Sequence, residues 1–270
     1  MNDFARATDH AQRNKGLKAG ARAGYVAYGI IYLLIGWLAL RLAWGGRRGS
    51  ADASGALHTL ANQSLGRALL VVVAIGLLAL AVWQGFEAAV GCRQYDDTKR
   101  TRKRLTAGGK AVAFAVIGVS ALRITAGAGA SSTKSEQKAA SGVLSLPGGE
   151  VIVLVAAAVV VSVGVVQIVQ GIKGSFEEDL ATGEMASGTR TAVRTIGTVG
   201  YTARGVAFVL IGILLGYAAA TADPKKANGL DGALHTILGQ PFGRYLLTAV
   251  AIGLAAAGVF AFAQARYQRL

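Results

Sequence analysis

The chain has 270 residues, of which 53% are hydrophobic and 16% are charged, and its formal net charge is +14. A mean hydropathy of +0.47 is too high for a soluble domain of this size and is typical of a protein that crosses a membrane several times. The polar segments are too short to fold into a nucleic-acid-binding module, so the positive charge does not predict a nucleic-acid partner.

Six apolar stretches are long enough to cross a membrane as helices, which takes roughly 20 residues. Their apolar residues do not alternate with polar ones, which argues against an outer-membrane barrel. The single cysteine, Cys92, excludes a disulfide within the chain, and no cofactor or metal site is expected. In chain order the stretches lie between Arg22 and Arg41, between Arg67 and Glu87, from Ala111 to Ala130, between Glu150 and Lys173, between Arg204 and Asp223, and between Arg244 and Arg266.

Basic residues are concentrated on one side of the predicted spans, in the N-terminal segment and in the connection after the second span. Because the cytosolic flanks of membrane helices are enriched in Lys and Arg, we expect a multi-pass protein of the inner (plasma) membrane with both termini in the cytosol. One basic run is expected to bind anionic lipids of the cytosolic leaflet, at about 1 kcal/mol per side chain. It comprises Lys99, Arg100, Arg102, Lys103 and Arg104.

A two-helix unit occurs three times along the chain. The first and third copies share a span that begins Gly-Tyr, a connection that reads Gly-Ala-Leu-His, and a Gly-Arg corner before Ala-Ile-Gly-Leu. In the divergent middle copy, Gly142-Val143-Leu144-Ser145 replaces the connection motif and Pro147-Gly148-Gly149-Glu150 replaces the corner. The matching residues are Gly24-Tyr25 and Gly200-Tyr201, Gly55 to His58 and Gly232 to His235, and Leu65-Gly66-Arg67 and Phe242-Gly243-Arg244.

A unit with an even number of spans always re-enters the membrane in the same orientation, so the three copies are parallel. We therefore predict an all-α membrane protein, a bundle of six transmembrane helices with pseudo-threefold symmetry, packed through glycines such as Gly212 and Gly216. The predicted segments are a cytosolic N-terminal segment (1–19), repeat 1 (20–91), a basic cytosolic linker (92–104), repeat 2 (105–174), a second cytosolic linker (175–196) and repeat 3 (197–270).

The repeated pattern resembles a bacterial membrane family known only as domain of unknown function 1206, in which such a hairpin typically occurs three times. The resemblance runs from about Gly20 to Ala265 and rests on the span, connection and corner motifs quoted above. The middle copy departs from the connection and corner motifs. The resemblance implies a membrane fold of repeated hairpins, and it brings no established activity.

Polar side chains inside the predicted spans are costly unless they have partners. Five of them lie near the cytosolic ends of the even-numbered spans, and Gln84 and Glu87 share one helix face. One interpretation is hydrogen bonding between helices. The other is a polar ring of Glu87, Gln170 and Gln264 that lines a path for a cation or small solute. The aligned positions are Gln84 with Gln167, and Glu87 with Gln170 and Gln264.

The outer connections contain a second set of candidates. Ser54 and Asp231 precede the Gly-Ala-Leu-His motifs and are predicted N-caps of short surface helices. His58 and His235 then either form hydrogen bonds at the interface or carry metal or protons, although the middle repeat has Ser145 instead of a third ligand. Elsewhere, Arg204 is read as a cytosolic anchor and Glu177-Glu178-Asp179 as a solvated loop. An aromatic belt is predicted from Tyr25, Tyr28, Tyr201 and Tyr267 on the cytosolic side and from Trp44, Tyr217 and Tyr245 on the other.

The chain contains no motif of a known catalytic or nucleotide-binding site, so an enzyme is not expected. The favoured hypothesis is an accessory or scaffold bundle that binds lipid or another membrane protein complex. The alternative is a channel or carrier for a small solute or ion along the pseudo-threefold polar path. A third hypothesis is a membrane enzyme that uses His58 and His235.

Overall fold

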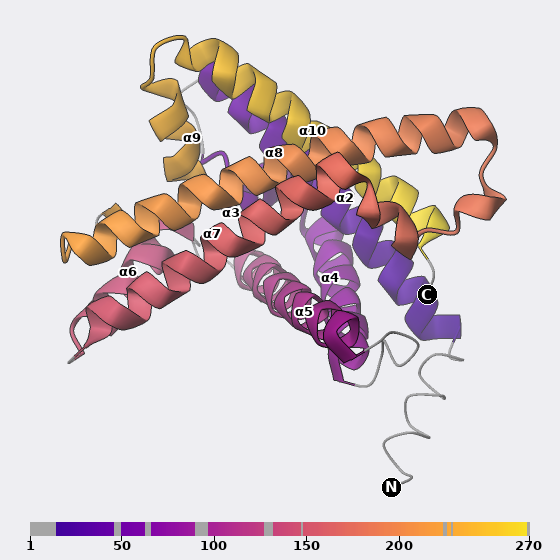
Figure 1. The fold of residues 1–270 in the computed structure, drawn as a ribbon, viewed down its shortest axis with the longest axis horizontal. Helices are drawn as coiled ribbons and strands as arrows, with labels where there is room; N and C mark the ends of the chain where they lie inside the picture. The colour runs from indigo at the N-terminus through magenta and orange to yellow at the C-terminus, as the bar shows by residue number, and fades with distance from the viewer. Residues whose placement is uncertain are drawn as a thin grey trace, which may run out of the picture. The chain divides into compact units, whose positions relative to one another are not determined.

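The computed structural model describes residues 15–45, 50–62, 66–89, 97–126, 132–146, 148–223, 226–227 and 229–268. The regular elements in these ranges are helices (Figure 1). In chain order they are α2 (Lys15–Ala43), α3 (Ala53–Ala61), α4 (Gly66–Ala89), α5 (Asp97–Thr125), α6 (Ser132–Leu144), α7 (Gly149–Lys173), the 3₁₀ turns η1 (Ser175–Asp179) and η2 (Thr182–Glu184), α8 (Ser187–Ala220), α9 (Leu230–Leu238) and α10 (Gly243–Tyr267).

Six of these helices are long and apolar enough to cross a membrane, which confirms the six predicted spans. Repeat 1 supplies α2 and α4, repeat 2 supplies α5 and α7, and repeat 3 supplies α8 and α10. Two helices begin well before their predicted spans, α5 at Asp97 and α8 at Ser187. Hydropathy marks only the part of a helix that fits the hydrocarbon core, whereas a helix can continue into water through charged and hydroxyl residues. The predicted linkers are therefore partly helical.

A short helix precedes each even-numbered span. The predicted surface helices of repeats 1 and 3 are α3 and α9, and the divergent repeat 2 has a counterpart in α6. Figure 1 shows α6 at the start of α7, and α6 packs against that helix. All three repeats therefore consist of a long helix, a short helix and a second long helix.

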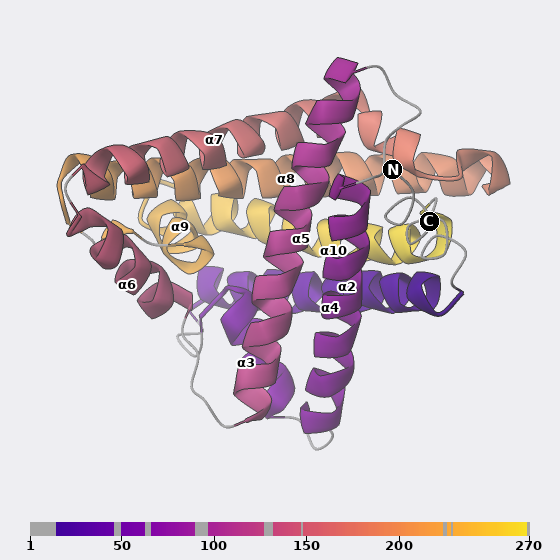
Figure 2. The ribbon, with the colours of Figure 1, turned by 90° about the horizontal axis from the view of Figure 1, so that it is seen from below.

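The chain folds as two compact units. Unit 1 comprises Met1–Tyr28, Leu60–Ala128 and Ala261–Leu270, and unit 2 comprises Gly29–Thr59 and Gly129–Phe260. The boundary between them falls within α2, within α3 and within α10. In unit 1, α4 and α5 lie side by side (Figure 2), and Tyr28 meets Phe114 edge to face with their ring centroids 5.0 Å apart.

The helix interfaces between repeats are built three times in the same way. In each, the glycine of the Ile-Gly motif of an odd-numbered span contacts the even-numbered span of another repeat. Its two partners on that span are the carbonyl oxygen of an alanine and the residue four positions after that alanine. A Cβ atom added at these glycines would lie 2.6–3.0 Å from the nearest atom of the facing helix, which is a backbone atom for Gly36 and a side-chain atom for Gly118 and Gly212. The contacts join Gly118 to Ala74 and Leu78 in unit 1, and in unit 2 they join Gly212 to Ala157 and Val161, and Gly36 to Ala251 and Ala255.

These three interfaces form a closed set. Repeat 2 packs on repeat 1 through α5 and α4, repeat 3 packs on repeat 2 through α8 and α7, and repeat 1 packs on repeat 3 through α2 and α10. A cyclic arrangement requires one interface type that is used once by every copy. One repeated glycine contact therefore supplies the kind of interface that the predicted pseudo-threefold bundle requires, and the threefold arrangement itself stays a prediction. Figure 2 shows α7, α8 and α10 of unit 2 lying next to one another.

The two helices of one repeat also meet at equivalent positions. In unit 1, a Cβ added at Gly24 of α2 would lie 2.7 Å from Leu80 Cβ of α4. In unit 2, a Cβ added at Gly200 of α8 would lie 2.7 Å from Ala257 Cα of α10. Gly24 and Gly200 are the first residues of the shared Gly-Tyr motifs, so this motif marks the contact within a repeat and the Ile-Gly motif marks the contact between repeats.

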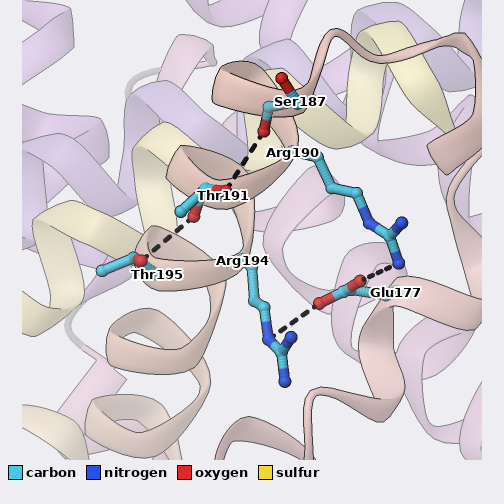
Figure 3. A network of polar contacts seen from close by, with 6 residues as sticks. All are labelled: Glu177, Ser187, Arg190, Thr191, Arg194 and Thr195. Carbon is cyan, nitrogen blue, oxygen red and sulfur yellow. Dashed lines mark hydrogen bonds and ion pairs between the residues drawn. The ribbon is translucent and has the colours of Figure 1, made fainter.

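The connection between α7 and α8 is ordered by a carboxylate, which corrects the prediction of a solvated acidic loop. Glu177 of η1 has a side chain that is only 15% exposed. Its Oε2 atom lies 3.3 Å from Arg190 Nη2 and its Oε1 atom lies 3.2 Å from Arg194 Nε (Figure 3). Because residues four apart lie on one face of a helix, the two arginines of α8 reach the same carboxylate.

An aromatic cluster lies beside this carboxylate in unit 2. The ring of Phe176, the residue before Glu177, stacks on Tyr201 with a centroid separation of 5.1 Å. Phe260 meets Phe176 and Tyr201 edge to face, at 5.1 and 5.7 Å. Of the predicted aromatic belt, Trp44, Tyr217 and Tyr245 are exposed, whereas Tyr25, Tyr28 and Tyr201 are buried, so the prediction is wrong for these three tyrosines. They lie on the glycine-lined helix faces, where packing decides burial.

Gly205→Ala is expected to lower the free energy of unfolding of the purified protein in detergent by about 1–3 kcal/mol, because the added methyl group would overpack the interface. Thermal unfolding measures this change. Its Cβ would lie 2.6 Å from the Gly164 carbonyl oxygen and from Ile168 Cγ1. The matched control is Gly109→Ala in α5, where nothing lies within 4 Å. That substitution should be neutral or should stabilise the helix by about 0.5–1 kcal/mol. Equal effects at the two sites would contradict the packing role.

Glu177→Gln is expected to speed amide hydrogen exchange in Ser175–Leu180, because it removes the charge that both arginines contact. Exposed ion pairs contribute about 0.2–1 kcal/mol, so the acceleration should be at most about fivefold. It should shrink in 1 M salt, which screens charges beyond about 3 Å. Glu150→Gln, at an exposed carboxylate of α7, should leave this segment unchanged. Unaltered protection of η1 in low salt would refute the proposed role of Glu177.

Candidate functional site

The outer connections of repeats 1 and 3 are joined within unit 2. Asp231, in the first turn of α9, accepts a hydrogen bond through Oδ1 from the backbone N–H of Ala51, at 2.8 Å. Ala51 lies just before α3. A buried hydrogen bond to a charged group contributes about 1.5–3 kcal/mol, which is enough to hold the two connections together. The structure therefore brings the two histidine-containing helices into one unit.

The N-caps of α3 and α9 differ from those predicted. Asp52 caps α3, since its Oδ1 accepts the N–H of Gly55 at 2.8 Å. Ser54 is buried inside the helix. The residue before α9 is Gly229, and Asp231 lies inside the first turn. Asp, Ser and Asn have nearly equal N-cap preferences, so the sequence alone could not distinguish Asp52 from Ser54.

His235 is held by its own helix. Its Nδ1 atom lies 2.9 Å from the backbone oxygen of Asp231 and 3.6 Å from Asp231 Oδ2, and its side chain is 54% exposed. In the neutral tautomer Nδ1–H donates to that oxygen, which leaves Nε2 as an acceptor. His58 lies at the equivalent position of α3 and is partly buried. Among the described residues no three His, Cys, Asp or Glu side chains gather as a metal site would require.

The corner before α10 is repeated in the middle copy, although its sequence differs. Gly148 and Phe242 both have positive φ angles, of 74° and 61°. Gly149 and Gly243 follow them, and an added Cβ at either would overlap carbonyl oxygens from the end of the preceding short helix. The equivalent backbone bonds are Ser145 to Ser141 and Gly239 to His235 (both 3.1 Å), Gly149 to Leu146 and Gly243 to Gln240 (2.9 and 2.8 Å), and Val151 to Gly148 and Tyr245 to Phe242 (3.1 and 2.9 Å).

This register corrects the alignment of the middle connection. It places Ser141, rather than Ser145, at the position of His235. The number of residues that separates Ser141 from His235 also separates Phe114 from Phe208, the matched phenylalanines of the two spans. The predicted pairing matched the motif Gly142 to Ser145 with Gly232 to His235, and it would have needed a four-residue gap before the corner. The middle repeat therefore keeps the backbone of the corner, with Glu150 at the position of Arg244 and a serine at that of the histidine.

The candidate polar residues of the spans are divided between the units. Gln84, Glu87 and Gln264 belong to unit 1, whereas Gln167 and Gln170 belong to unit 2, so the polar ring stays a prediction. Gln84 is 2% exposed and donates through Nε2 to the Tyr25 hydroxyl at 3.2 Å. The Oε1 atoms of Gln84 and Gln167 are buried and have no hydrogen-bond partner in the described part of the chain. Gln264 is buried, and Glu87 and Gln170 are partly buried.

The predicted lipid-binding run lies in the first turns of α5, which begins at Asp97. The side chains of Lys99, Arg100, Arg102 and Lys103 lie outside the described residues, and Arg104 is partly buried. Binding of cytosolic-leaflet lipids by this run therefore stays a prediction.

Arg204 has a role that the sequence did not reveal. Its guanidinium carbon lies 5.2 Å from the centroid of the Tyr32 ring and 5.6 Å from that of Tyr201, all within unit 2. Cation–π contacts of this geometry contribute about 0.5–2 kcal/mol. Arg204 is therefore part of the helix packing as well as a candidate anchor. The signal in the sequence is its position directly before Gly205, on the edge of the glycine face.

Comparison with known proteins agrees with the repeated architecture. The family described as domain of unknown function 1206 matches at residues 23–91, 105–174 and 199–268, one match for each repeat. An uncharacterized protein of Bacillus subtilis (strain 168), YxxB, is 32% identical over 255 residues, which cover 94% of this chain and 92% of that protein. No solved structure matches the chain. The chain thus belongs to the family of domain of unknown function 1206 and contains three tandem copies of the domain. It is a membrane protein, and six helices of its described part are long and apolar enough to cross a membrane.

Proposed function

We propose that the protein is a non-enzymatic accessory or scaffold bundle that binds lipid or another membrane protein complex. The observation that carries this proposal is the close approach of helices from different repeats at the Ile-Gly glycines. In unit 2, Cβ atoms added at Gly36 and Gly212 would lie 2.9 and 2.6 Å from the facing helices. Backbones at such distances leave no room for side chains that could line a path between those helices.

The outward faces of the helices supply the binding surface in this proposal. The α7 helix of unit 2 has the highest mean hydropathy of the six, 2.9, and only 22% of its most apolar window is buried inside the structure. Large apolar side chains cover the rest, and in a membrane such a surface contacts acyl chains or another helix. The exposed residues of α7 include Val151, Ile152, Leu154, Val155, Val159 and Ile172.

The channel or carrier alternative rests on a different observation. Gln84 and Gln167 are buried in the spans, and each has an amide oxygen without a hydrogen-bond partner in the described residues. Such an oxygen is expensive in an apolar environment and is suited to coordinate water or a cation. We rank this alternative second, because Gln84 already bonds Tyr25 within one repeat and the two glutamines belong to different units.

The scaffold proposal predicts a stoichiometric companion. Native mass spectrometry of the protein, purified gently from its own membrane, should show a second protein or a retained lipid that survives washing. A matched sample in which Gly205→Ala loosens the α7–α8 contact should lose that companion at a lower detergent concentration. A bare chain under every mild condition would contradict the proposal.

Ion flux separates the two functions. Liposomes that contain the purified wild-type protein should show no potassium or proton flux above protein-free liposomes. Glu87→Ala and Gln84→Leu should leave this background unchanged, since in a scaffold these residues serve packing. A wild-type flux that Glu87→Ala removes would overturn the scaffold proposal and support the polar path.

A further inference from the structure

An open pocket lies at the start of α10, entirely within unit 2. Its volume is about 820 Å³, within the range of sites that hold small molecules and lipid headgroups. The end of α2, the end of α9 and the corner before α10 form its walls. The residues that line it with polar groups are His235, Gln240, Arg244 and Tyr245, and those that line it with apolar groups are Leu42, Leu238 and Phe242.

The polar side of the pocket is suited to an anion. Arg244 is exposed and has no ion pair or side-chain hydrogen bond within the described part of the chain. His235 adds its other ring nitrogen, Nε2, which accepts a hydrogen bond from a ligand while Nδ1–H donates to the backbone oxygen of Asp231. The first turn of α10 begins at Gly243, so the positive end of the helix dipole lies at the same place, although the N–H groups of Gly243, Tyr245 and Leu246 already bond the carbonyls of Gln240 and Phe242.

The carboxylate of Asp231, which lies beside His235, does not neutralise this charge. Asp231 uses Oδ1 to accept the Ala51 N–H at 2.8 Å, and its Oδ2 lies 3.6 Å from His235 Nδ1. It does not line the pocket. The guanidinium of Arg244 therefore remains the strongest charge in the pocket, and guanidinium binds phosphate oxygens in pairs.

Exposed aromatic rings indicate the depth of the pocket. Trp44 follows α2, and Phe242 and Tyr245 stand at the start of α10, with exposed fractions of 64%, 80% and 69%. Tryptophan and tyrosine collect at the level of the lipid headgroups. The pocket thus combines a cation at headgroup depth with an apolar wall formed by Leu42 and Leu238.

We propose that this pocket binds the phosphate group of an anionic phospholipid in the leaflet that surrounds the start of α10. Arg244 contacts the phosphate, and Gln240 donates to its oxygens through the second hydrogen of Nε2, whose first bonds the Thr236 backbone oxygen at 3.4 Å. His235 Nε2 accepts a hydrogen bond from a hydroxyl of the headgroup, and the apolar wall receives the upper part of an acyl chain. The proposal rests on the lipid-binding part of the proposed function and names a site for it. A free phosphate ion offers the same oxygens, and the experiment below separates the two sources.

The middle repeat provides an internal comparison. Its corner has the same backbone, but Glu150 stands at the position of Arg244 and Ser141 at that of His235. A carboxylate at that place repels phosphate. The backbone alone therefore does not make the anion site, and the side chains of repeat 3 confer it.

The test measures phosphatidylglycerol bound to the purified full-length protein by native mass spectrometry, against phosphatidylcholine as the zwitterionic reference. Arg244→Gln should weaken phosphatidylglycerol binding at least about tenfold, as expected for loss of a charge-assisted contact. Arg244→Lys should retain part of the binding. The matched control is Arg123→Gln, which removes an exposed arginine at the end of α5 and should bind like wild type.

Inorganic phosphate identifies the source of the ligand. If millimolar phosphate leaves lipid binding unchanged, the bound species is the lipid, and if it displaces the lipid through Arg244, the site also takes the free ion. Equal phosphatidylglycerol affinity of wild type and Arg244→Gln would overturn the proposal. The companion protein expected of a scaffold should remain on Arg244→Gln, so loss of that companion in wild type would contradict the scaffold without bearing on the lipid site.

Discussion

Direct backbone contact at glycine is the interaction on which this structure depends. Lipid tails are as apolar as leucine, so helices in a membrane gain nothing by hiding apolar surface, and close van der Waals approach has to hold them together. The Ile-Gly glycines make that approach three times, once for each pair of repeats. A second pair of facing glycines occurs at two of these contacts, with Gly29 and Gly258 between α2 and α10, and Gly205 and Gly164 between α8 and α7. In each pair, a Cβ added at one glycine would lie 2.6–2.8 Å from the carbonyl oxygen of the other. Every copy of the hairpin thus uses the same type of interface.

The composition and the repeats predicted the class of fold, because span length and motif spacing are local properties of the sequence. The sequence also identified glycine as the packing residue, although it ranked Gly212 and Gly216 together. In the structure Gly212 is in tight contact, whereas a Cβ at Gly216 would lie 3.6 Å from Ala157 Cβ, an ordinary distance. Which glycine faces a neighbour depends on the partner helix, and for these two glycines the partner is α7 of another repeat. The local sequence of a span does not specify that partner.

The candidate site was harder to predict, for physical reasons that differ from residue to residue. The N-cap of α3 is Asp52 rather than Ser54, since both side chains can accept the same hydrogen bond. The tyrosines of the Gly-Tyr motifs looked like interfacial residues, but they lie beside glycines that bring helices close, and so they are buried. Glu177 looked solvated because its partners, Arg190 and Arg194, come from a helix that begins earlier than hydropathy indicates. In each case the deciding contact comes from another part of the chain.

The corners show how repeats with a common backbone acquire different chemistry. In repeats 2 and 3 the corner has a residue with positive φ, followed by a glycine that lies against carbonyl oxygens from the end of the short helix. This backbone leaves no room for a Cβ atom at the second position. Repeat 2 satisfies the first position with Gly148, which adopts positive φ without strain, whereas repeat 3 places Phe242 there against its intrinsic preference. The exposed ring of Phe242 stands at the mouth of the pocket that contains Arg244. Repeat 3 therefore carries a side chain at a backbone position that favours glycine, and that side chain adds apolar surface to the pocket that contains Arg244.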